Sequence, residues 1–329
     1  MKNKTKTIIG LLSILVCITG CGKVAKLENG QDAVVKLKGK DISVDSLYNE
    51  MKDKYALSVL LDMIDTQILN DKYKDTEEQE NSIESQISTW TTQFGSEQQL
   101  LQKTTSAWGI STIDALKEYL KLQYKRNTAI EDYSKSLVTD DEINTFYEEK
   151  IFGDISAKHI LISPKTTNNM TDDEKKAAEE EALKKAKEII TKLNNGEDFE
   201  TLAKENSDDE ATASKGGKLS DFTYGTMDTE FEEAAKKLEN GKYTTEPVKT
   251  TYGYHIIYKI SQKDKPKLKV VKDDIIEDIA KEKLSNDSAL QVTALEELRK
   301  EYKIDIQDKT LKTQYENYLT NAKKNTSNS

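Results

Sequence analysis

The hydrophobic and polar positions of the chain follow a helical period over most of its length, and the period changes only in the middle. Between residues 33 and 150, apolar side chains recur at three- and four-residue spacing, which predicts amphipathic helices. One such stripe consists of Leu57, Leu60, Ile64 and Ile68. After Pro266 the helical spacing returns, so helical flanks enclose a central region with a different pattern.

Capping residues and turn residues mark the predicted boundaries in the first flank. Ala33–Leu37 is predicted to form a short strand before the helices begin. Ser111 is placed to cap a helix that starts near Ile113. Thr139 and Glu142 have the spacing of a capping box and predict another helix that runs to about residue 150.

The central region mixes short strand signals with helical ones. Ala157–Ile162 reads as a strand that stops before Pro164, and Thr171 opens a helix with a second capping box. Further strand signals lie at Pro247–Val248 and Gly253–Ile260. A strand, several helices and more strands within roughly a hundred residues predict a small α+β domain.

The C-terminal part of the chain is expected to pack against the N-terminal helices. Ile304 and Ile306 alternate with charged residues as in a short strand, and Leu311–Leu319 predicts a final helix. Neither flank is apolar enough to form a core alone, so we expect the two flanks to pack together. The predicted segments are a signal peptide at 1–20, a tether at 21–32, a helical chaperone-like module at 33–150, the α+β domain at 151–262, C-terminal helices packed on the helical module at 263–320, and a disordered tail at 321–329.

The first residues carry a targeting signal. A lysine-rich start precedes the apolar run Ile8–Thr19, which is too short to span a bilayer and fits a signal peptide. The run ends in Ile18-Thr19-Gly20-Cys21, which resembles the lipobox of bacterial lipoproteins. We therefore expect lipid on Cys21 and a location on the extracytoplasmic face of the cell membrane. The alternative is an ordinary secretory signal with an incidental cysteine.

Composition narrows the possible chemistry. The net charge is −10 and no basic stripe is present, so nucleic acid is not an expected partner. Cys17 leaves with the signal peptide and Cys21 carries lipid, which excludes a cysteine nucleophile or a cysteine-bound metal in the folded part.

The chain has only two histidines, His159 and His255, and each lies in a strand signal at one end of the α+β domain. Strands that open and close a domain often pair in its sheet, so the two side chains could meet in the core. The alternative role is purely structural. A metal site is not predicted, because no third ligand stands at useful spacing.

Three blocks of residues resemble the parvulin family of peptidyl-prolyl isomerases in order and spacing over roughly a hundred residues. They are Ala157–Leu161; Phe199–Ala203 with Asn206–Asp209 and Gly216–Phe222; and Met227 with Phe231–Ala234, Glu246–Val248 and Tyr252–Ile257. The whole arrangement of leader, helical module, central domain and C-terminal helices is similar to that of the PrsA-type extracytoplasmic foldases.

The resemblance implies cis–trans isomerisation of X–Pro bonds without a cofactor. It places Leu219, Met227 and Phe231 in an apolar pocket with Phe222 beside it, although these positions also fit plain core packing. It places His159 and His255 beneath the site, hydrogen-bonded to each other or through Thr250. Asp209, where some parvulins have cysteine, would act electrostatically or be a solvated loop charge. Tyr252 stands where other members have a small hydroxyl residue.

The leading hypothesis is an isomerase and chaperone whose partners are unfolded or partly folded exported proteins, with a homodimer as a further possibility. The alternative is a holdase that uses the parvulin fold only as a scaffold, because a fold does not guarantee activity. A solute-binding lipoprotein is disfavoured, since it would need larger lobes of alternating strands and helices.

Overall fold

The computed structural model describes residues 32–38 and 41–324, which form two compact units. Unit 1 holds the described residues up to Ile130 and from Ser288 onward, and unit 2 holds Glu131–Asp287. The predicted signal peptide, Cys21, nearly all of the tether and residues 325–329 lie outside the described residues. The fold is α+β, with a three-stranded antiparallel sheet in the parvulin-like part of the chain.

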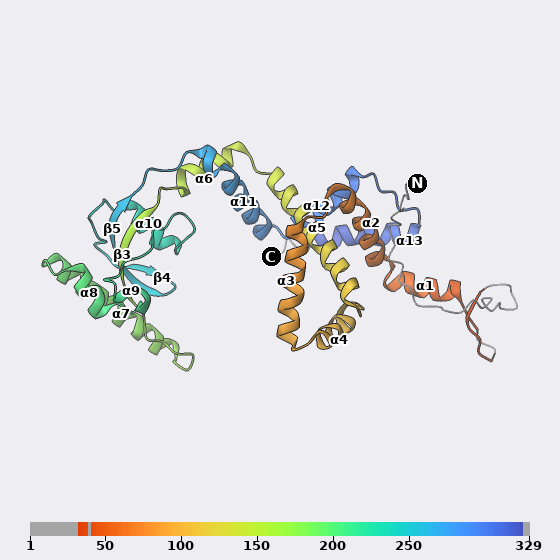
Figure 1. Ribbon diagram of the computed structural model, residues 1–329, viewed down its shortest axis with the longest axis horizontal. Helices are drawn as coiled ribbons and strands as arrows, with labels where there is room; N and C mark the ends of the chain where they lie inside the picture. The colour runs from red at the N-terminus through yellow and green to blue at the C-terminus, as the bar shows by residue number, and fades with distance from the viewer. Residues whose placement is uncertain (1–31, 39–40, 325–329) are drawn as a thin grey trace, which may run out of the picture. The chain divides into compact units, whose positions relative to one another are not determined.

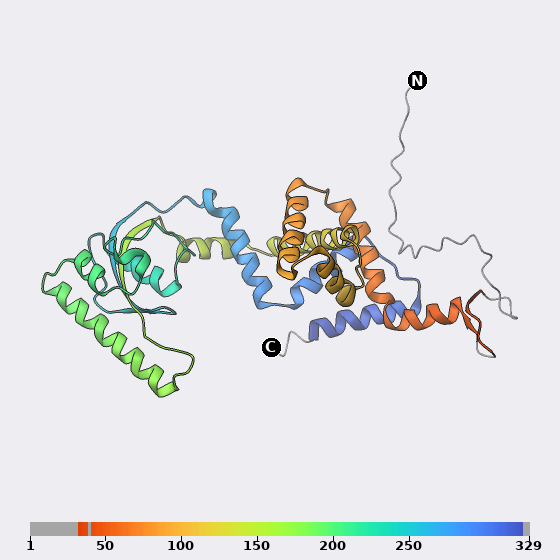
Figure 2. The ribbon, with the colours of Figure 1, turned by 60° about the horizontal axis from the view of Figure 1, so that its bottom comes forward.

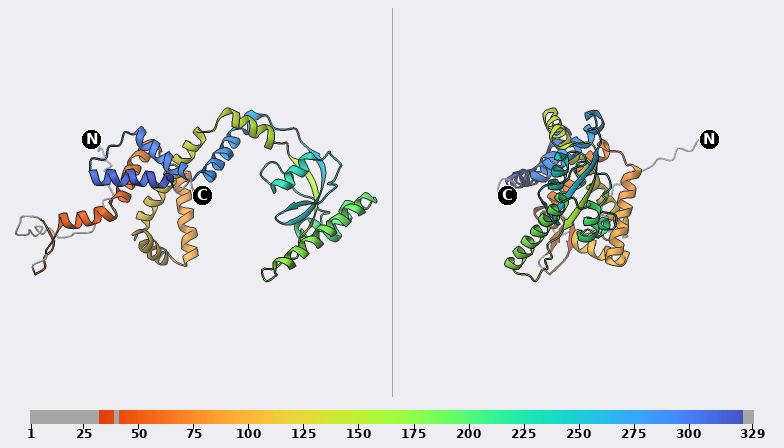
Figure 3. Two further views of the ribbon diagram at one scale, coloured as in Figure 1. Left: turned by 180° about the vertical axis from the view of Figure 1, so that it is seen from behind. Right: turned by 90° about the vertical axis from the view of Figure 1, so that its left-hand side faces the viewer.

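Unit 1 is helical apart from one short strand pair (Figure 1). Its elements are β1 (Ala33–Val35), β2 (Ile42–Ser43), α1 (Val44–Lys54), α2 (Ala56–Lys72), α3 (Glu77–Phe94), α4 (Glu97–Trp108), α5 (Ile113–Ser136, which continues into unit 2), α12 (Ala289–Glu301) and α13 (Lys309–Lys324). Helices α3 and α4 meet at a sharp turn, where Gly95 has a φ of 91° and Ser96 caps α4 (Figure 3).

Two predicted details of unit 1 are wrong. The helix α5 is capped by Thr112 instead of Ser111, since the Thr112 hydroxyl accepts a hydrogen bond from the Ala115 N–H at 3.2 Å. Residues 304–306 form no strand; they lie in the connection between α12 and α13. Ile304 packs there against the apolar core of α2, α5 and α12, and none of the strands within residues 32–38 and 41–324 pairs with it.

Buried charges tie three helices of unit 1 together. Asp65 of α2 is almost fully buried and accepts hydrogen bonds from Nε of Arg126 in α5 at 2.8 Å and from Nε of Arg299 in α12 at 2.7 Å. These are the only two arginines in the chain. Because a buried carboxylate needs strong partners, this cluster fixes how the last part of the chain packs on the first.

Unit 2 contains the sheet and the helices around it. Its elements are α6 (Asp140–Lys150), β3 (Ile155–Ile162), α7 (Asp172–Asn194), α8 (Phe199–Asn206), α9 (Glu210–Ala213), α10 (Thr229–Lys237), β4 (Val248–Thr250), β5 (Gly253–Gln262) and α11 (Leu268–Asn286). The strands are antiparallel in the order β3-β5-β4, so β5 is central. The capping boxes predicted at Thr139 and Thr171 are both present.

The two faces of this sheet carry different helices. Ile160 and Ile256 point to the face covered by α7 and α8, and Figure 2 shows α7 as one long helix beside the sheet. Ala157 and Ile257 point to the opposite face, which α10 covers. Because side chains alternate along a strand, the odd-numbered His159 and His255 share the α10 face.

Helices α6 and α11 pack on each other and belong to the same unit as the sheet, so this unit extends past residues 151–262 at both ends. Phe146 of α6 contacts Tyr224 edge to face, with ring centroids 5.1 Å apart. Of the segment 263–320, α12 and α13 lie in unit 1 and α11 lies in unit 2.

Candidate active site

The structure brings the two histidines together. Antiparallel pairing of β3 with β5 sets Leu161 opposite His255 and His159 opposite Ile257, so the histidines are diagonal neighbours on one face. Their Nδ1 atoms are 3.1 Å apart, and the rings are stacked with centroids 5.4 Å apart. Both side chains are buried, at 6% and 5% exposure.

The hydrogen bonds around the pair allow one consistent assignment of protons. Nε2 of His159 lies 2.7 Å from Oδ2 of Asp209, and the carboxylate can only accept, so this nitrogen donates. The neutral ring then accepts at Nδ1 from Nδ1–H of His255. Nε2 of His255 in turn accepts from the Thr250 hydroxyl at 2.8 Å. The chain of hydrogen bonds thus runs from Thr250 to Asp209 with both imidazoles neutral.

The electrostatics favour the same protonation state. Burial, followed by the charge of the neighbouring His159, lowers the pKa of His255 to about 4. Burial also lowers the pKa of His159, although the hydrogen bond to Asp209 opposes this effect. For Asp209, burial raises the pKa, but hydrogen bonds from Thr212 and His159 outweigh it, and the net pKa lies below its usual range. At neutral pH the site therefore holds two neutral imidazoles and one carboxylate.

An apolar cluster covers the histidines. The ring of Phe231 on α10 meets His159 edge to face at 5.8 Å between centroids and His255 at 5.3 Å. Phe222 lies 5.7 Å from Phe231 and is itself almost fully buried. Leu219 and Met227 pack against the same cluster and remain partly exposed. These four residues form an apolar surface beside a polar network, which suits an apolar ring with a flanking amide.

A backbone segment on the outer edge of β3 sets the position of Leu219. The His159 N–H donates to the Gly217 carbonyl at 2.9 Å, and the Leu219 N–H donates to the Ala157 carbonyl at 3.1 Å. Gly217 has a φ of 77°, and a Cβ there would lie 2.1 Å from the His159 carbonyl oxygen. Only glycine allows this close approach.

The predicted site residues are not all drawn into the cluster. Tyr252 lies in the turn between β4 and β5 and is 65% exposed. Its backbone N–H donates to the Thr250 hydroxyl at 3.2 Å, so the turn supports the network while the phenol ring stays at the surface. Thr250 itself is buried.

Two residues with clear contacts here were not predicted. Thr212 donates to Oδ2 of Asp209 and holds the carboxylate toward His159. The signal that could have found it is its position three residues after Asp209, on the short helix α9 that Asp209 caps. The second residue is Glu232, which follows Phe231 on α10 and is buried.

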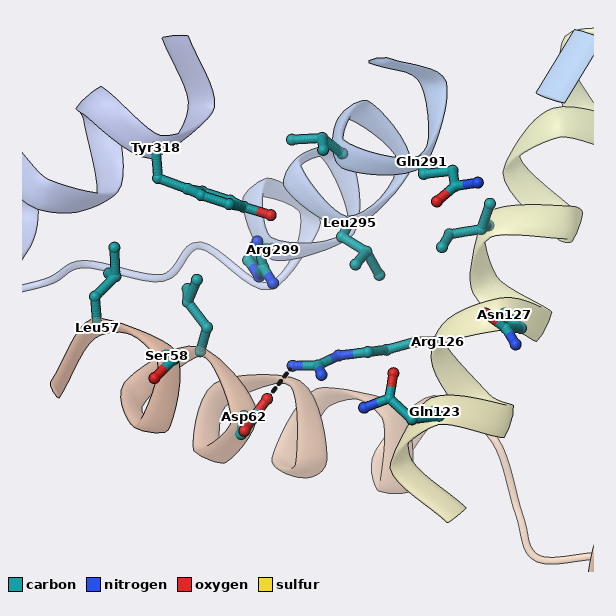
Figure 4. A pocket seen from close by; sticks show the side chains of 13 residues that line it. Leu57, Ser58, Asp62, Gln123, Arg126, Asn127, Gln291, Leu295, Arg299 and Tyr318 are labelled. Atoms are coloured by element: carbon teal, nitrogen blue, oxygen red, sulfur yellow. Dashed lines mark hydrogen bonds and ion pairs between the residues drawn. The ribbon is translucent and has the colours of Figure 1, made fainter. Parts of the chain in front are cut away.

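Unit 1 contains a separate pocket of about 420 Å³ among α2, α5, α12 and α13 (Figure 4). Leu57, Leu61 and Leu295 give it apolar walls. Arg126 reaches across to Asp62, with which it forms a hydrogen bond of 2.7 Å. The carboxylates of Asp62 and Asp65 neutralise the Arg126 guanidinium, so the pocket has apolar walls and a polar edge whose charges are paired.

No helix within residues 32–38 and 41–324 combines the length and apolar character that crossing a membrane requires. The same part of the chain contains no group of three or more histidine, cysteine, aspartate or glutamate side chains placed to hold a metal ion.

Comparison with known proteins agrees with this geometry. Residues 159–261 match the family model of the rotamase PPIC-type PPIase domain. The chain is 36% identical over 299 residues to foldase protein PrsA of Geobacillus kaustophilus, covering 90% of this chain and 92% of the relative. It is 32% identical to foldase protein PrsA of Bacillus subtilis strain 168, with coverage of 93% and 90%.

Solved structures give the same picture. A crystal structure of peptidylprolyl isomerase PrsA from Bacillus cereus is 31% identical, covers 87% of this chain and 98% of its own, and has a TM-score of 0.50. Foldase protein PrsA from Streptococcus pneumoniae has a TM-score of 0.62 with coverage of 86% and 98%, and at 21% identity this likeness concerns the fold alone.

Proposed function

This chain belongs to the PrsA foldase family and carries a parvulin-type peptidyl-prolyl isomerase domain, and we propose that it works as a lipid-anchored foldase for exported proteins. The observation that carries the catalytic part is the stacked histidine pair, which is joined to Asp209 and Thr250 and covered by Phe231.

The proposed mechanism needs no covalent step. Rotation about an X–Pro bond faces a barrier of ~18–20 kcal/mol, mainly the loss of amide resonance in the twisted state. Leu219, Met227 and Phe231 hold the apolar prolyl ring, which fixes one side of the rotating bond. The oriented dipoles of the histidine pair favour the charge distribution of the twisted amide, because they are already aligned when the bond turns.

The test is prolyl cis–trans exchange in a short Ala-Pro or Lys-Pro peptide, followed by NMR with the intact chain. We expect the chain to accelerate exchange, and His255→Ala and Met227→Ala to lose about tenfold or more. A change far from the site, Lys184→Gln on the outer part of α7, serves as the matched control. A folded chain that gives no acceleration would contradict the catalytic proposal.

The chaperone part is supported by an exposed apolar face at the start of unit 1. Among the described residues, 11 of the 18 large hydrophobic side chains that are exposed lie between residues 34 and 63. Helix α1 has no buried residue at all, so its apolar side is free to bind other chains. The eleven exposed side chains between residues 34 and 63 are Val34, Val35, Leu37, Ile42, Val44, Leu47, Tyr48, Met51, Tyr55, Val59 and Met63.

We assign this face to apolar segments of unfolded exported proteins. Large exposed apolar patches mark interaction sites, and flexible methionines such as Met51 and Met63 adapt to varied partners. The assay is suppression of aggregation of an unfolded test protein. Leu47→Ser with Met51→Ser should weaken suppression and leave prolyl exchange unchanged. If the paired change instead turns a dimer into a monomer and suppression is unaffected, the face is a contact between copies and the assignment is wrong.

The anchoring part rests on the sequence before residue 32. The apolar run and the lipobox-like residues up to Cys21 support lipidation, and several acyl chains hold a protein firmly on a membrane. Labelled palmitate should enter the wild-type chain in cells and be absent from Cys21→Ser. Equal labelling of both chains would contradict the anchor.

A further inference from the structure

Helix α10 presents two neighbouring side chains to two parts of the site. Phe231 covers the histidines, and the next residue, Glu232, turns its carboxylate into the protein and is only 6% exposed. A buried carboxylate is costly unless it is fully hydrogen-bonded. Within the described part of the chain, its partners are backbone amides, with no lysine or arginine among them.

The three amides belong to consecutive residues of one turn. The Gly225 N–H donates to Oε2 of Glu232 at 3.1 Å, and the N–H groups of Thr226 and Met227 both donate to Oε1 at 2.8 Å. The turn is closed by a 3.2 Å hydrogen bond from the Thr226 N–H to the Thr223 carbonyl, and Gly225 has a φ of 74°. One side chain therefore accepts from three consecutive amides, of which the Thr226 N–H is shared with the Thr223 carbonyl.

The turn leads directly into the apolar surface of the site. Met227, the last of the three residues, packs against the cluster that contains Phe231. The following residue, Asp228, is tied to the turn between β4 and β5, since its carboxylate accepts from the Thr251 hydroxyl at 3.0 Å. Met227 thus sits on a short segment that carboxylates hold on both sides. A long, flexible side chain gains a defined position only if its backbone is fixed in this way.

We propose that Glu232 is a positioning residue for prolyl isomerisation, acting through Met227. Its carboxylate fixes residues 225–227 and so holds the Met227 side chain against Phe231, where the prolyl ring binds. This inference rests on the isomerase function proposed above. The competing possibility is that Glu232 only stabilises the fold, as many buried carboxylates at turns do.

The first experiment compares two substitutions that remove the same charge from the same helix. Glu232→Gln keeps the shape but replaces one acceptor oxygen with an NH₂ group. Glu233→Gln, the matched control, alters a partly exposed glutamate that pairs with Lys236 and Lys237. With the intact chain and an Ala-Pro peptide, we expect Glu232→Gln to lower kcat/KM about tenfold, mostly through KM, because the ring contact exists before and during rotation. Glu233→Gln should stay within about twofold of wild type.

A spectroscopic readout separates positioning from stability. The chain has only five methionines, so the Met227 methyl NMR signal can be assigned directly. It should shift and sharpen in Glu232→Gln and remain unchanged in Glu233→Gln. The two histidine ring signals report whether each variant is folded. If Glu232→Gln does not fold, Glu232→Asp is the second variant, since it keeps the charge and withdraws the carboxylate by one methylene.

A double-mutant cycle decides the route of the effect. If Glu232 acts through Met227, then Glu232→Gln should cost little further activity in a Met227→Ala background. Fully additive losses, or an unchanged KM with only a lower melting temperature, would overturn the proposal. A wild-type chain that does not accelerate exchange would overturn the isomerase site itself. A wild-type chain that is active, with both glutamate variants equally active, would overturn only the role of Glu232.

Discussion

Acid should weaken unit 2 through His255 in a measurable way. The imidazole is buried between His159 and Thr250, and its pKa falls from an ordinary value of 6.5 to about 4. An unfolded chain takes up this proton near pH 6.5, whereas the folded chain resists until about pH 4. The stabilising contribution is therefore complete above pH 6.5 and is lost progressively as the pH falls toward 4.

The size of the effect follows from the gap of about 2.5 pH units between the two states. Each pH unit corresponds to about 1.4 kcal/mol, so the full loss well below pH 4 is about 3.5 kcal/mol, and at pH 4.5 it is about 2.5 kcal/mol. Burial also lowers the pKa of His159, which adds a loss of the same sign. Against a total stability of about 5–15 kcal/mol for a typical protein, this is a large fraction.

The assay is urea unfolding at pH 7.5, 6.0, 5.0 and 4.5, followed by the histidine ring signals in NMR. Tryptophan fluorescence would not serve, because Trp90 and Trp108 both lie in unit 1. Other groups also titrate in this range, so the comparison is with His255→Asn, which is neutral throughout. The variant should lose less stability on acidification than wild type, by about 2.5 kcal/mol at pH 4.5.

Two results would refute the reasoning. Parallel pH profiles for wild type and His255→Asn would mean that the imidazole does not resist protonation in the fold. A directly titrated pKa of His255 near 6.5 would show that burial is offset by contacts other than those described. Either outcome would also remove the argument that both imidazoles are neutral at the pH where the isomerase works.

Two further predictions concern other parts of the chain. Asp65→Ala leaves the buried Arg299 without its carboxylate and Arg126 with Asp62 as its remaining carboxylate partner. Unit 1 should therefore lose about 3–5 kcal/mol in unfolding monitored by tryptophan fluorescence, with prolyl exchange unchanged at temperatures where the chain is folded; a loss below about 1 kcal/mol would contradict this. Gly217→Ala places a Cβ against the His159 carbonyl and requires a strained φ, so exchange activity and the urea midpoint of unit 2 should both fall. Wild-type values for both would show that the backbone at residue 217 moves away from His159 without cost.

Local signals along the chain predicted much of the fold because they depend on neighbouring residues only. The capping boxes at Thr139 and Thr171 and the strands that carry the histidines are of this kind. The predictions failed where contacts between residues far apart in the sequence determine the local structure. Ile304 alternates with charges like a strand residue, but it is partly buried against the apolar core of α2, α5 and α12 and pairs with none of the strands in the described residues. Either hydroxyl can cap a helix, so the sequence does not distinguish Ser111 from Thr112. The helix begins at Ile113, which makes Thr112 the residue whose hydroxyl accepts from the Ala115 N–H.

The site shows the same limit at the level of single residues. The acidic run Asp208-Asp209-Glu210 left open whether Asp209 is solvated. Only the packing of this run beside β3, where the Asp208 N–H donates to the Leu161 carbonyl at 2.7 Å, brings the Asp209 carboxylate to His159. Likewise, Glu230, Glu232 and Glu233 are equivalent in the sequence, and the rotation of α10 decides that the middle one is buried. Charge patterns reveal that carboxylates are present, while the fold determines which of them face inward.

The direction of the hydrogen-bond chain has a consequence for how the site works. Because the Asp209 carboxylate can only accept, it fixes the tautomer of His159, which in turn fixes that of His255 and turns the Thr250 hydroxyl toward Nε2. An amide at position 209 could donate as well as accept, and the direction of every hydrogen bond from residue 209 to Thr250 could then reverse. Every dipole beneath the apolar surface thus takes its orientation from one charge at the far end, and a bound prolyl amide meets an aligned environment without waiting for protons or solvent to rearrange.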